Sequence, residues 1–430
     1  MNIRRDRYLE QLKDSRGNGQ IKVITGIRRA GKSYLLFKIY YDYLLENGVG
    51  KDSIIQIMLD DDTFEQLRDP NKLSQYIRSH ITDTKQTYYV FLDEVQYAIS
   101  QEEIKNPDKP IQLYSILNGL LHLGNIDIYV TGSNSKFLSK DVMTEFRGRG
   151  NVIHVYPLSF TEYYSHVGGE KAEAFEEYAM FGGMPFVLSL HSEKKKIQYL
   201  SNLFTEVYFK DIVERYRVDL EQILGQLTDT LCSSVGSLTN ANKIAKTLSS
   251  VRGKQTSSET IAKYIEYLLD SFLFAEAKRF DVKGKRYFQY PNKYYCTDIG
   301  LRNTRLNFRQ QEESHIMENI IYNELVLRGY RVDVGVVEFT ETTENGIRRQ
   351  KNCEIDFVVS SGSTKHYIQT ALNIDTVEKE KQELRPLFGI NDSFKKILVT
   401  KTYAKPWTDE KGILHVGLYE FLLDEKSLIS

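Results

Sequence analysis

Short apolar runs separated by helical patterns characterise residues 1–157 of the chain. Residues 21–26 are β-branched and apolar, and residues 33–48, which follow them, place apolar side chains at helical spacing. Two further runs, 87–96 and 126–134, look like buried strands, and each ends in acidic or small polar residues. This pattern predicts an α/β domain on a parallel sheet, with the carboxyl ends of its strands at one crevice.

The middle of the chain has a different pattern. Residues 158–220 are helical throughout, which suits a lid that closes over a bound ligand. Residues 221–305 combine helices with a strand hairpin, and this order predicts a winged-helix module. Its expected elements are two capped helices and two wing strands: 237–250, 257–274, 274–280 and 285–291.

Residues 306–430 are expected to form a further domain after a polar linker. An amphipathic helix is followed by three strands, a second helix and a last strand, predicted at 315–329, 330–339, 348–360, 366–373, 378–389 and 395–400. The predicted fold class of the whole chain is therefore multidomain α/β.

Composition narrows the class of protein without changing this outline. The 430 residues indicate about two to four domains, and 41% hydrophobic with 27% charged residues is ordinary for a soluble globular protein. A net charge of −1 argues against a protein that mainly coats nucleic acid. The first residues lack the apolar core of a signal peptide, and no uncharged apolar run approaches the roughly 18 residues that span a bilayer. We expect a cytoplasmic protein without a membrane partner.

The cysteines are not expected to form disulfide bonds or to bind a metal ion. Cys232, Cys296 and Cys353 are odd in number, far apart, and without the spacing typical of zinc ligands. We therefore expect reduced thiols rather than a disulfide framework or a metal site.

Candidate chemistry begins at residues 26–33, GIRRAGKS, which have the spacing of a phosphate-binding loop. Because the loop lies between a predicted strand and a predicted helix, its N–H groups would surround phosphates at the helix N-terminus. Lys32 would reach the β and γ phosphates, and the Ser33 hydroxyl would bind Mg²⁺. The expected nucleotide contacts are Gly26, Arg28, Arg29, Ala30, Gly31, Lys32, Ser33 and Tyr34. The alternative is a polar turn that matches by chance.

A nucleotide hydrolase of this kind also needs carboxylates at the end of a neighbouring strand. Asp93 and Glu94 occupy such a position; Asp93 would hold Mg²⁺, and Glu94 would orient and polarise the attacking water. The alternative is a strand that ends in a solvated acidic turn. ATP is favoured over GTP because no guanine-reading NKxD motif is found.

Two further polar groups follow in the sequence. Ser133 and Asn134 end the third apolar run, from which they could sense the γ phosphate. Arg147 and Arg149 lie in a glycine-flanked loop and could stabilise charge on a transferring phosphoryl group, in the same chain or in a neighbouring subunit. The alternative for both arginines is a solvated surface loop.

These motifs, in this order, resemble a large group of prokaryotic AAA-type ATPases with a C-terminal domain of unknown function. The segments concerned are RDRYLEQL, GIRRAGKS, YVFLDEVQ, VTGSNS, the GR of FRGRG, HVYPLSFTEYY and FGGMP. The resemblance implies that Gly26, Gly31, Lys32 and Ser33 are Walker A, Asp93 and Glu94 are Walker B, and Ser133 or Asn134 is sensor 1. It further implies that Arg149 is the arginine finger and that Gly183 and Pro185 form a lid element that touches the nucleotide.

DNA binding by the winged helix is considered but not favoured. The outward residues of its second helix include Glu259, Lys263 and Glu266, and two glutamates would repel phosphates. The wing itself is basic through Lys278, Arg279, Lys283, Lys285 and Arg286. A packing and communication role is the favoured interpretation.

The last domain resembles the PD-(D/E)XK nuclease fold with a damaged site. Glu318 and Asp356 match the first two carboxylate positions, but Gln369-Thr370-Ala371 replaces the expected Glu-x-Lys. Lys379 or Lys381 could substitute for the missing lysine. We expect an inactive nuclease-like domain reused for binding, rather than an active nuclease.

Three functions remain open. The favoured one is a Mg²⁺-dependent ATPase whose nucleotide state rearranges a partner protein or its own later domains. The second is a slow nucleotide-gated switch or scaffold. The third is an ATP-dependent DNA-binding or nuclease protein. If Arg149 acts on a neighbouring subunit, we expect weak self-association that ATP strengthens.

Overall fold

The computed structural model describes residues 3–100, 102–103, 110–132, 150–252, 256–284, 286–287, 291–309, 312–342, 348–402 and 405–428. The chain forms two compact units, one of Met1–Pro157 with Asp270–Phe272 and one of Leu158–Leu269 with Leu273–Ser430. Among the described residues, none of the helices combines the length and the apolar composition that a bilayer-spanning segment needs.

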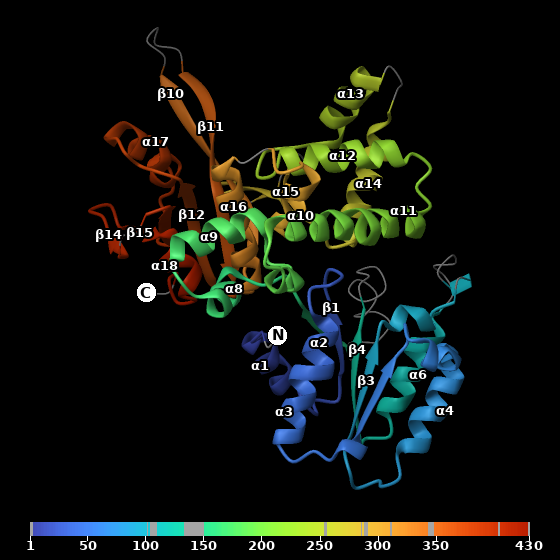
Figure 1. Cartoon of the computed structure of the whole chain (residues 1–430). Helices are drawn as coiled ribbons and strands as arrows, with labels where there is room; N and C mark the ends of the chain where they lie inside the picture. The colour runs from blue at the N-terminus through green and yellow to red at the C-terminus, as the bar shows by residue number, and fades with distance from the viewer. Residues whose placement is uncertain are drawn as a thin grey trace. The chain divides into compact units, whose positions relative to one another are not determined.

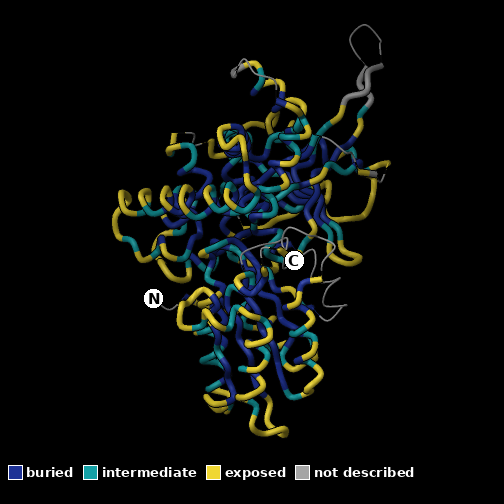
Figure 2. The backbone as a smooth tube through the Cα atoms, turned by 90° about the vertical axis from the view of Figure 1, so that its right-hand side faces the viewer, coloured by how far each residue is buried: buried dark blue, intermediate teal, exposed yellow. Residues whose placement is uncertain are grey.

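The first unit is built on a five-stranded parallel sheet with the order β2-β3-β4-β1-β5. The strands are β1 (Ile21–Thr25), β2 (Ile54–Met58), β3 (Tyr88–Asp93), β4 (Ile126–Thr131) and β5 (Gly150–His154). Every residue of the three central strands β1, β3 and β4 is buried, as Figure 2 shows in dark blue. The predicted parallel sheet is therefore confirmed, since continuous apolar runs suit strands covered on both faces.

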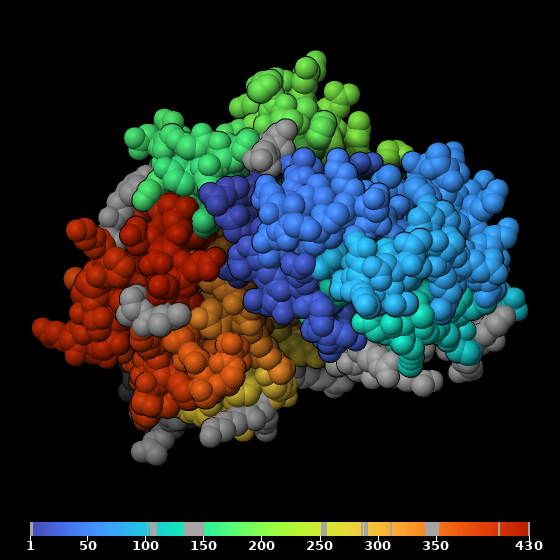
Figure 3. Space-filling model, turned by 90° about the horizontal axis from the view of Figure 1, so that it is seen from below, coloured from blue at the N-terminus to red at the C-terminus, as the bar shows by residue number. Residues whose placement is uncertain are grey.

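Helices cover both faces of this sheet (Figure 1). On one face α4 and α6 pack against alternate residues such as Val90 and Val130. On the other face Tyr40 packs against Phe91 and Tyr129. The helices are α1 (Asp6–Ser15), α2 (Lys32–Tyr34), a π-helical segment (Leu35–Tyr40), α3 (Tyr41–Glu46), α4 (Pro70–His80) and α6 (Gln112–Leu121), with 3-10 turns at Lys51–Ser53, Asp62–Arg68 and Val95–Ala98. In Figure 3 these blue to teal segments form a continuous surface.

The second unit begins with helices and a two-stranded antiparallel sheet of β6 (Phe274–Ala277) and β9 (Lys293–Cys296). Its helices are α8 (Phe160–Val167), α9 (Lys171–Phe181), α10 (Glu193–Asn202), a π-helical segment (Leu203–Phe209), α11 (Lys210–Tyr216), α12 (Glu221–Ser233), α13 (Ala241–Arg252), α14 (Ser258–Asp270) and α15 (Ile299–Arg305), with a 3-10 turn at Pro185–Ser189. The helical pattern predicted for this part of the chain is confirmed.

A mixed eight-stranded sheet with the order β14-β15-β13-β12-β11-β10-β7-β8 completes the second unit. Helix α16 packs on one face and α17 on the other, with a separate apolar cluster on each side. The elements are β7 (Arg279–Asp281), β8 (Arg286–Tyr287), α16 (Glu313–Leu327), β10 (Arg331–Thr342), β11 (Arg348–Ser361), β12 (Thr364–Ala371), α17 (Val377–Phe388), β13 (Lys395–Thr400), β14 (Trp407–Thr408), β15 (Ile413–Gly417) and α18 (Leu418–Leu423). From α16 to β13 they follow the predicted order.

The predicted wing is confirmed in part: its hairpin forms between β7 and β8, with Phe280 opposite Tyr287, but the first half of its first strand pairs elsewhere. The expected strand 274–280 is interrupted at Lys278, and its two halves enter different sheets. The first half, β6, pairs with β9, whereas β7 pairs with β8 and with β10 of the large sheet. The reason is that the β7–β8 hairpin satisfies the backbone groups at the edge of that sheet.

Candidate nucleotide-binding site

The loop after β1 requires glycine at its first position. Gly26 has φ of 133°, and a Cβ atom there would lie 2.1 Å from the carbonyl oxygen of Val155. Gly31 has φ of 96° and precedes the first residue of α2. Both conformations favour a residue without a side chain, so the loop turns sharply and directs its backbone toward the start of the helix.

Lys32 is buried within this loop, with 4% of its surface exposed. Its Nζ donates hydrogen bonds to the carbonyl oxygens of Gly26, at 3.0 Å, and Ile27, at 3.1 Å. Burial lowers the pKa of Lys32 to about 8, although the carboxylates of Glu94 and Asp93 act in the opposite direction. An ammonium group is thus held where the loop and the acidic end of β3 meet.

Asp93, the last residue of β3, is 5% exposed and is held by two hydroxyl groups. Thr131, the last residue of β4, donates a hydrogen bond to Asp93, and Ser33 makes another. Burial raises the pKa of Asp93, while these two hydrogen bonds lower it. The Ser33 hydroxyl and the Asp93 carboxylate fit Mg²⁺, which takes one or two protein oxygens and completes its shell with phosphate and water.

Glu94 follows Asp93 in a strained backbone conformation. Its φ is 49°, in the left-handed region that residues with a Cβ atom rarely adopt. The Glu94 N–H donates to the Thr131 hydroxyl at 3.1 Å, and the Gln96 amide donates to the Glu94 carboxylate. Thr131 therefore connects both acidic residues, a role that the sequence motifs did not indicate. The signal was available, because Thr131 ends a strand adjacent to β3.

His154, at the end of β5, is a second residue near this site that the sequence motifs did not indicate. Its Nδ1 lies 3.1 Å from the hydroxyl of Thr25 at the end of β1. Burial and, to a lesser extent, the charge of Lys32 lower the pKa of His154 to about 4. The imidazole is therefore neutral at pH 7.

The other predicted nucleotide contacts fall into two groups. Ala30 is buried and Arg28 is half-buried, whereas Arg29, Ser33 and Tyr34 are exposed on the loop and the first turn of the helix. Ser133, Asn134, Arg147 and Arg149 lie outside the described residues.

Gly183 and Pro185 belong to the second unit, where Gly183 is already bonded through both backbone groups. Its N–H donates to the Asp298 carboxylate at 2.7 Å, and its carbonyl accepts from Leu158 N–H at 2.7 Å. Pro185 starts a short 3-10 turn. These contacts give Gly183 a structural role within its own unit, which the sequence motif did not indicate.

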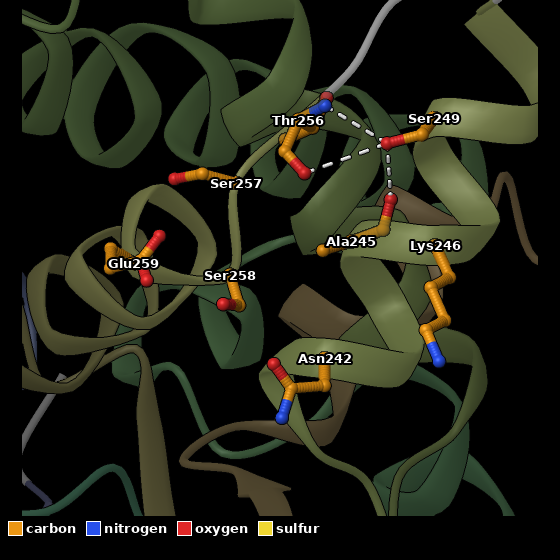
Figure 4. Close-up of a pocket in the computed structure, with 8 residues that line it drawn as sticks. All are labelled: Asn242, Ala245, Lys246, Ser249, Thr256, Ser257, Ser258 and Glu259. Carbon is orange, nitrogen blue, oxygen red and sulfur yellow. Dashed lines mark hydrogen bonds between the residues drawn. The ribbon is translucent and has the colours of Figure 1, made fainter.

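A polar hollow of about 730 Å³ lies between α13 and the start of α14 (Figure 4). Ser249 joins its two sides, since its hydroxyl donates to the Ala245 carbonyl at 2.7 Å and accepts from Thr256 N–H at 2.9 Å (Figure 4). Its lining includes one cationic side chain, Lys246, and one acidic side chain, Glu259. Lys263 and Glu266 are also exposed on α14, as predicted, so this helix presents mixed charge.

The predicted nuclease-like residues do come together in the second unit. Glu318 on α16, Asp356 on β11 and Gln369 on β12 are 8%, 9% and 8% exposed. Asp356 accepts hydrogen bonds from the N–H and the hydroxyl of Thr370, at 2.8 Å and 2.7 Å. Among the described residues, no three histidine, cysteine or acidic side chains are placed to hold a metal ion. The alternatives Lys379 and Lys381 are exposed on α17.

Two family models match successive parts of the chain. One, described as an AAA domain, covers residues 18–164, and the other, described as a domain of unknown function, covers residues 172–312. Among solved structures, the chain is similar to the Aeropyrum pernix ORC1 protein in complex with DNA. The sequence identity is 11%, the similarity covers 71% of this chain and 93% of that chain, and the TM-score is 0.29. The chain is also similar to Cdc6p from Pyrobaculum aerophilum. The sequence identity is 11%, the similarity covers 74% of this chain and 93% of that chain, and the TM-score is 0.29.

Curated relatives extend the similarity beyond the nucleotide site. An uncharacterized protein from Methanocaldococcus jannaschii is 29% identical over 377 residues, which are 84% of this chain and 77% of that protein. An uncharacterized protein from Haemophilus influenzae is 33% identical over 427 residues, which are 98% of each chain. The chain therefore belongs to the family of AAA-domain proteins, with a domain of unknown function after the AAA domain, that includes this Haemophilus influenzae protein.

Proposed function

We propose that this protein binds ATP with Mg²⁺ and hydrolyses it, and that its nucleotide state rearranges the second unit or a partner protein. The observation that carries the proposal is the convergence of Lys32, Asp93 and Glu94 at one end of the parallel sheet. A buried ammonium, a carboxylate beside a hydroxyl, and a second carboxylate are the groups that phosphoryl transfer to water requires.

Each residue has a separate task in this proposal. The N–H groups of residues 26–31 bind phosphate oxygens, and Lys32 exchanges its contacts with the loop carbonyls for contacts with the phosphates. Ser33 and Asp93 would hold Mg²⁺, and the bound ion would stabilise the negative charge that develops on the phosphate during hydrolysis. Glu94 orients and polarises the attacking water, and Thr131 positions the Asp93 carboxylate and the backbone of Glu94.

The contact between Gln96 and Glu94 favours a slow switch as the second candidate function. While the Gln96 amide binds the Glu94 carboxylate, that carboxylate is less free to accept a proton from water. In this alternative, ATP binding selects a conformation and turnover is slow.

The proposed ATP site is tested by replacing Lys32 with alanine. We expect Lys32→Ala to weaken Mg-ATP binding by about 30-fold or more, because a buried charged hydrogen-bonding partner of the phosphates is lost. The measurement is isothermal titration calorimetry of the full chain. Lys38→Ala is the matched control, since Lys38 lies on the following helical segment, exposed and paired with Asp42 at 2.9 Å. Equal affinities for the Lys32→Ala variant and the unmodified protein would contradict the proposal.

The lowered pKa of Lys32 predicts a pH dependence of ATP binding. Free protein loses the ammonium proton above pH 8, whereas bound phosphates raise the pKa and retain the proton. Affinity should therefore be constant below pH 8 and fall above it, by about tenfold between pH 7 and pH 9. The phosphates themselves are ionised throughout this range. Titration calorimetry at both pH values checks the prediction, and an affinity independent of pH would argue against Lys32 as the phosphate-binding cation.

A further inference from the structure

Lys293 is an ammonium group buried in the second unit, among the residues that resemble a nuclease site. It lies at the start of β9 and is 3% exposed. Its Nζ is 2.9 Å from Glu318 Oε1 and 2.7 Å from Glu354 Oε1. Burial lowers the pKa of Lys293, but Glu318, Asp356 and Glu354 together raise it above its ordinary value. The side chain is therefore charged, and we call the group Glu318, Glu354, Asp356 and Lys293 the acidic cluster.

The carboxylates of the acidic cluster have partners within the protein. Glu318 accepts a second hydrogen bond, at 2.7 Å, from the Tyr295 hydroxyl, and Asp356 is bonded by Thr370. The backbone of Gly236 lies close against Glu318. A Cβ atom added to Gly236 would lie only 3.1 Å from Glu318 Oε1. Water reaches the cluster at Glu354, whose side chain is 34% exposed.

The charges of the acidic cluster explain why a cation is needed at this point. Carboxylates removed from water are costly unless a positive charge compensates them. A nuclease of the expected kind would use a metal ion at this position. In this chain the ammonium group of Lys293, which belongs to the β6–β9 sheet, lies between the carboxylates of Glu318 and Glu354. The sheet of β6 and β9 is thereby tied to α16 and β11 of the neighbouring layer.

We propose that the acidic cluster is a cation site whose occupant is the chain's own Lys293, which excludes a divalent metal and joins the β6–β9 sheet to α16 and β11. The region from 306 to 430 then acts as a platform that holds the preceding helices and strands, and its carboxylates have no catalytic metal to bind. Removing the ammonium while keeping the length of the side chain leaves Glu318 and Glu354 without their cation, so that a divalent cation from solution can bind between these two carboxylates.

The test uses Mn²⁺ and the full chain without nucleotide, in an Asp93→Asn background that weakens the ATP site for metal. Mn²⁺ binding is measured by electron paramagnetic resonance, and thermal unfolding is followed by the fluorescence of Trp407, the one tryptophan. We expect the Lys293→Met variant to bind one Mn²⁺ ion more than its parent. Its affinity for this ion should exceed any Mn²⁺ affinity of the parent at least tenfold. Saturating Mn²⁺ should raise the unfolding midpoint of this variant by about 5 °C and leave that of the parent unchanged.

Lys293→Arg is the matched control, because it keeps a cation and should bind no more Mn²⁺ than the parent. Adding Glu318→Gln to Lys293→Met should abolish the new binding. The proposal is overturned if the parent binds Mn²⁺ and Glu318→Gln removes that binding, or if Lys293→Met and Lys293→Arg bind Mn²⁺ equally. Should Lys293→Met be unfolded without metal, refolding on addition of Mn²⁺ supports the proposal, and failure to refold contradicts it.

Discussion

Replacing Glu94 by glutamine is expected to slow ATP hydrolysis by at least about 100-fold while ATP binding is retained, because a positioned general base contributes about 10²- to 10⁴-fold. Glutamine keeps the shape of the side chain and the backbone contact with Thr131, but an amide cannot accept a proton from water. The measurement is steady-state Mg-ATP turnover of the full chain, with binding measured separately by calorimetry.

Glu46→Gln is a suitable control for this variant, since Glu46 is an exposed glutamate at the end of α3 in the same unit. Its turnover should match that of the unmodified protein. If Glu94→Gln keeps more than a tenth of the activity, Glu94 is not the group that polarises water. If the unmodified protein binds ATP but hardly turns it over, the slow switch held by Gln96 becomes the better description.

Replacing Gly183 by alanine is expected to destabilise the second unit by about 3 kcal/mol or more, since a new methyl group has no room. A Cβ atom at Gly183 would lie 2.1 Å from the carbonyl oxygen of Leu158 and 3.0 Å from its carbonyl carbon. The two backbones cannot separate cheaply, because Leu158 N–H donates to the Gly183 carbonyl and Asp298 holds the Gly183 N–H. Urea unfolding followed by Trp407 fluorescence reports on this unit directly.

Gly225→Ala provides the contrast within the same unit. Gly225 lies in α12, and a Cβ atom there would meet the flexible end of Arg305 at 3.4 Å and Phe209 at 3.8 Å, which are ordinary contacts. Alanine is the better helix former by about 1 kcal/mol, so this variant should be neutral or slightly more stable. A Gly183→Ala protein as stable as the unmodified one would show that the segment around Gly183 is not held against Leu158 as described.

Residues close together in the sequence account for most of what was predicted correctly. The parallel sheet, the loop at 26–33 and the acidic end of β3 all follow from runs of apolar residues and their immediate neighbours. The order of elements from α16 to β13 was predicted for the same reason. The β7–β8 hairpin was also predicted, but the pairing of β7 with β10 was not, because β10 lies some fifty residues later in the sequence and no local pattern indicates that contact.

The sequence by itself determined the phosphate-binding loop, because glycine, lysine and serine act there within eight consecutive residues. Only the tertiary structure brought Thr131 to Asp93, His154 to Thr25, and Lys293 to Glu318. These partners lie on different strands and helices, and apart from the position of Thr131 at the end of a predicted strand, no local pattern distinguishes them from other polar residues. Burial makes them significant: once water is excluded, each charged or hydroxyl group needs a partner, and the sheet register decides which partner is within reach.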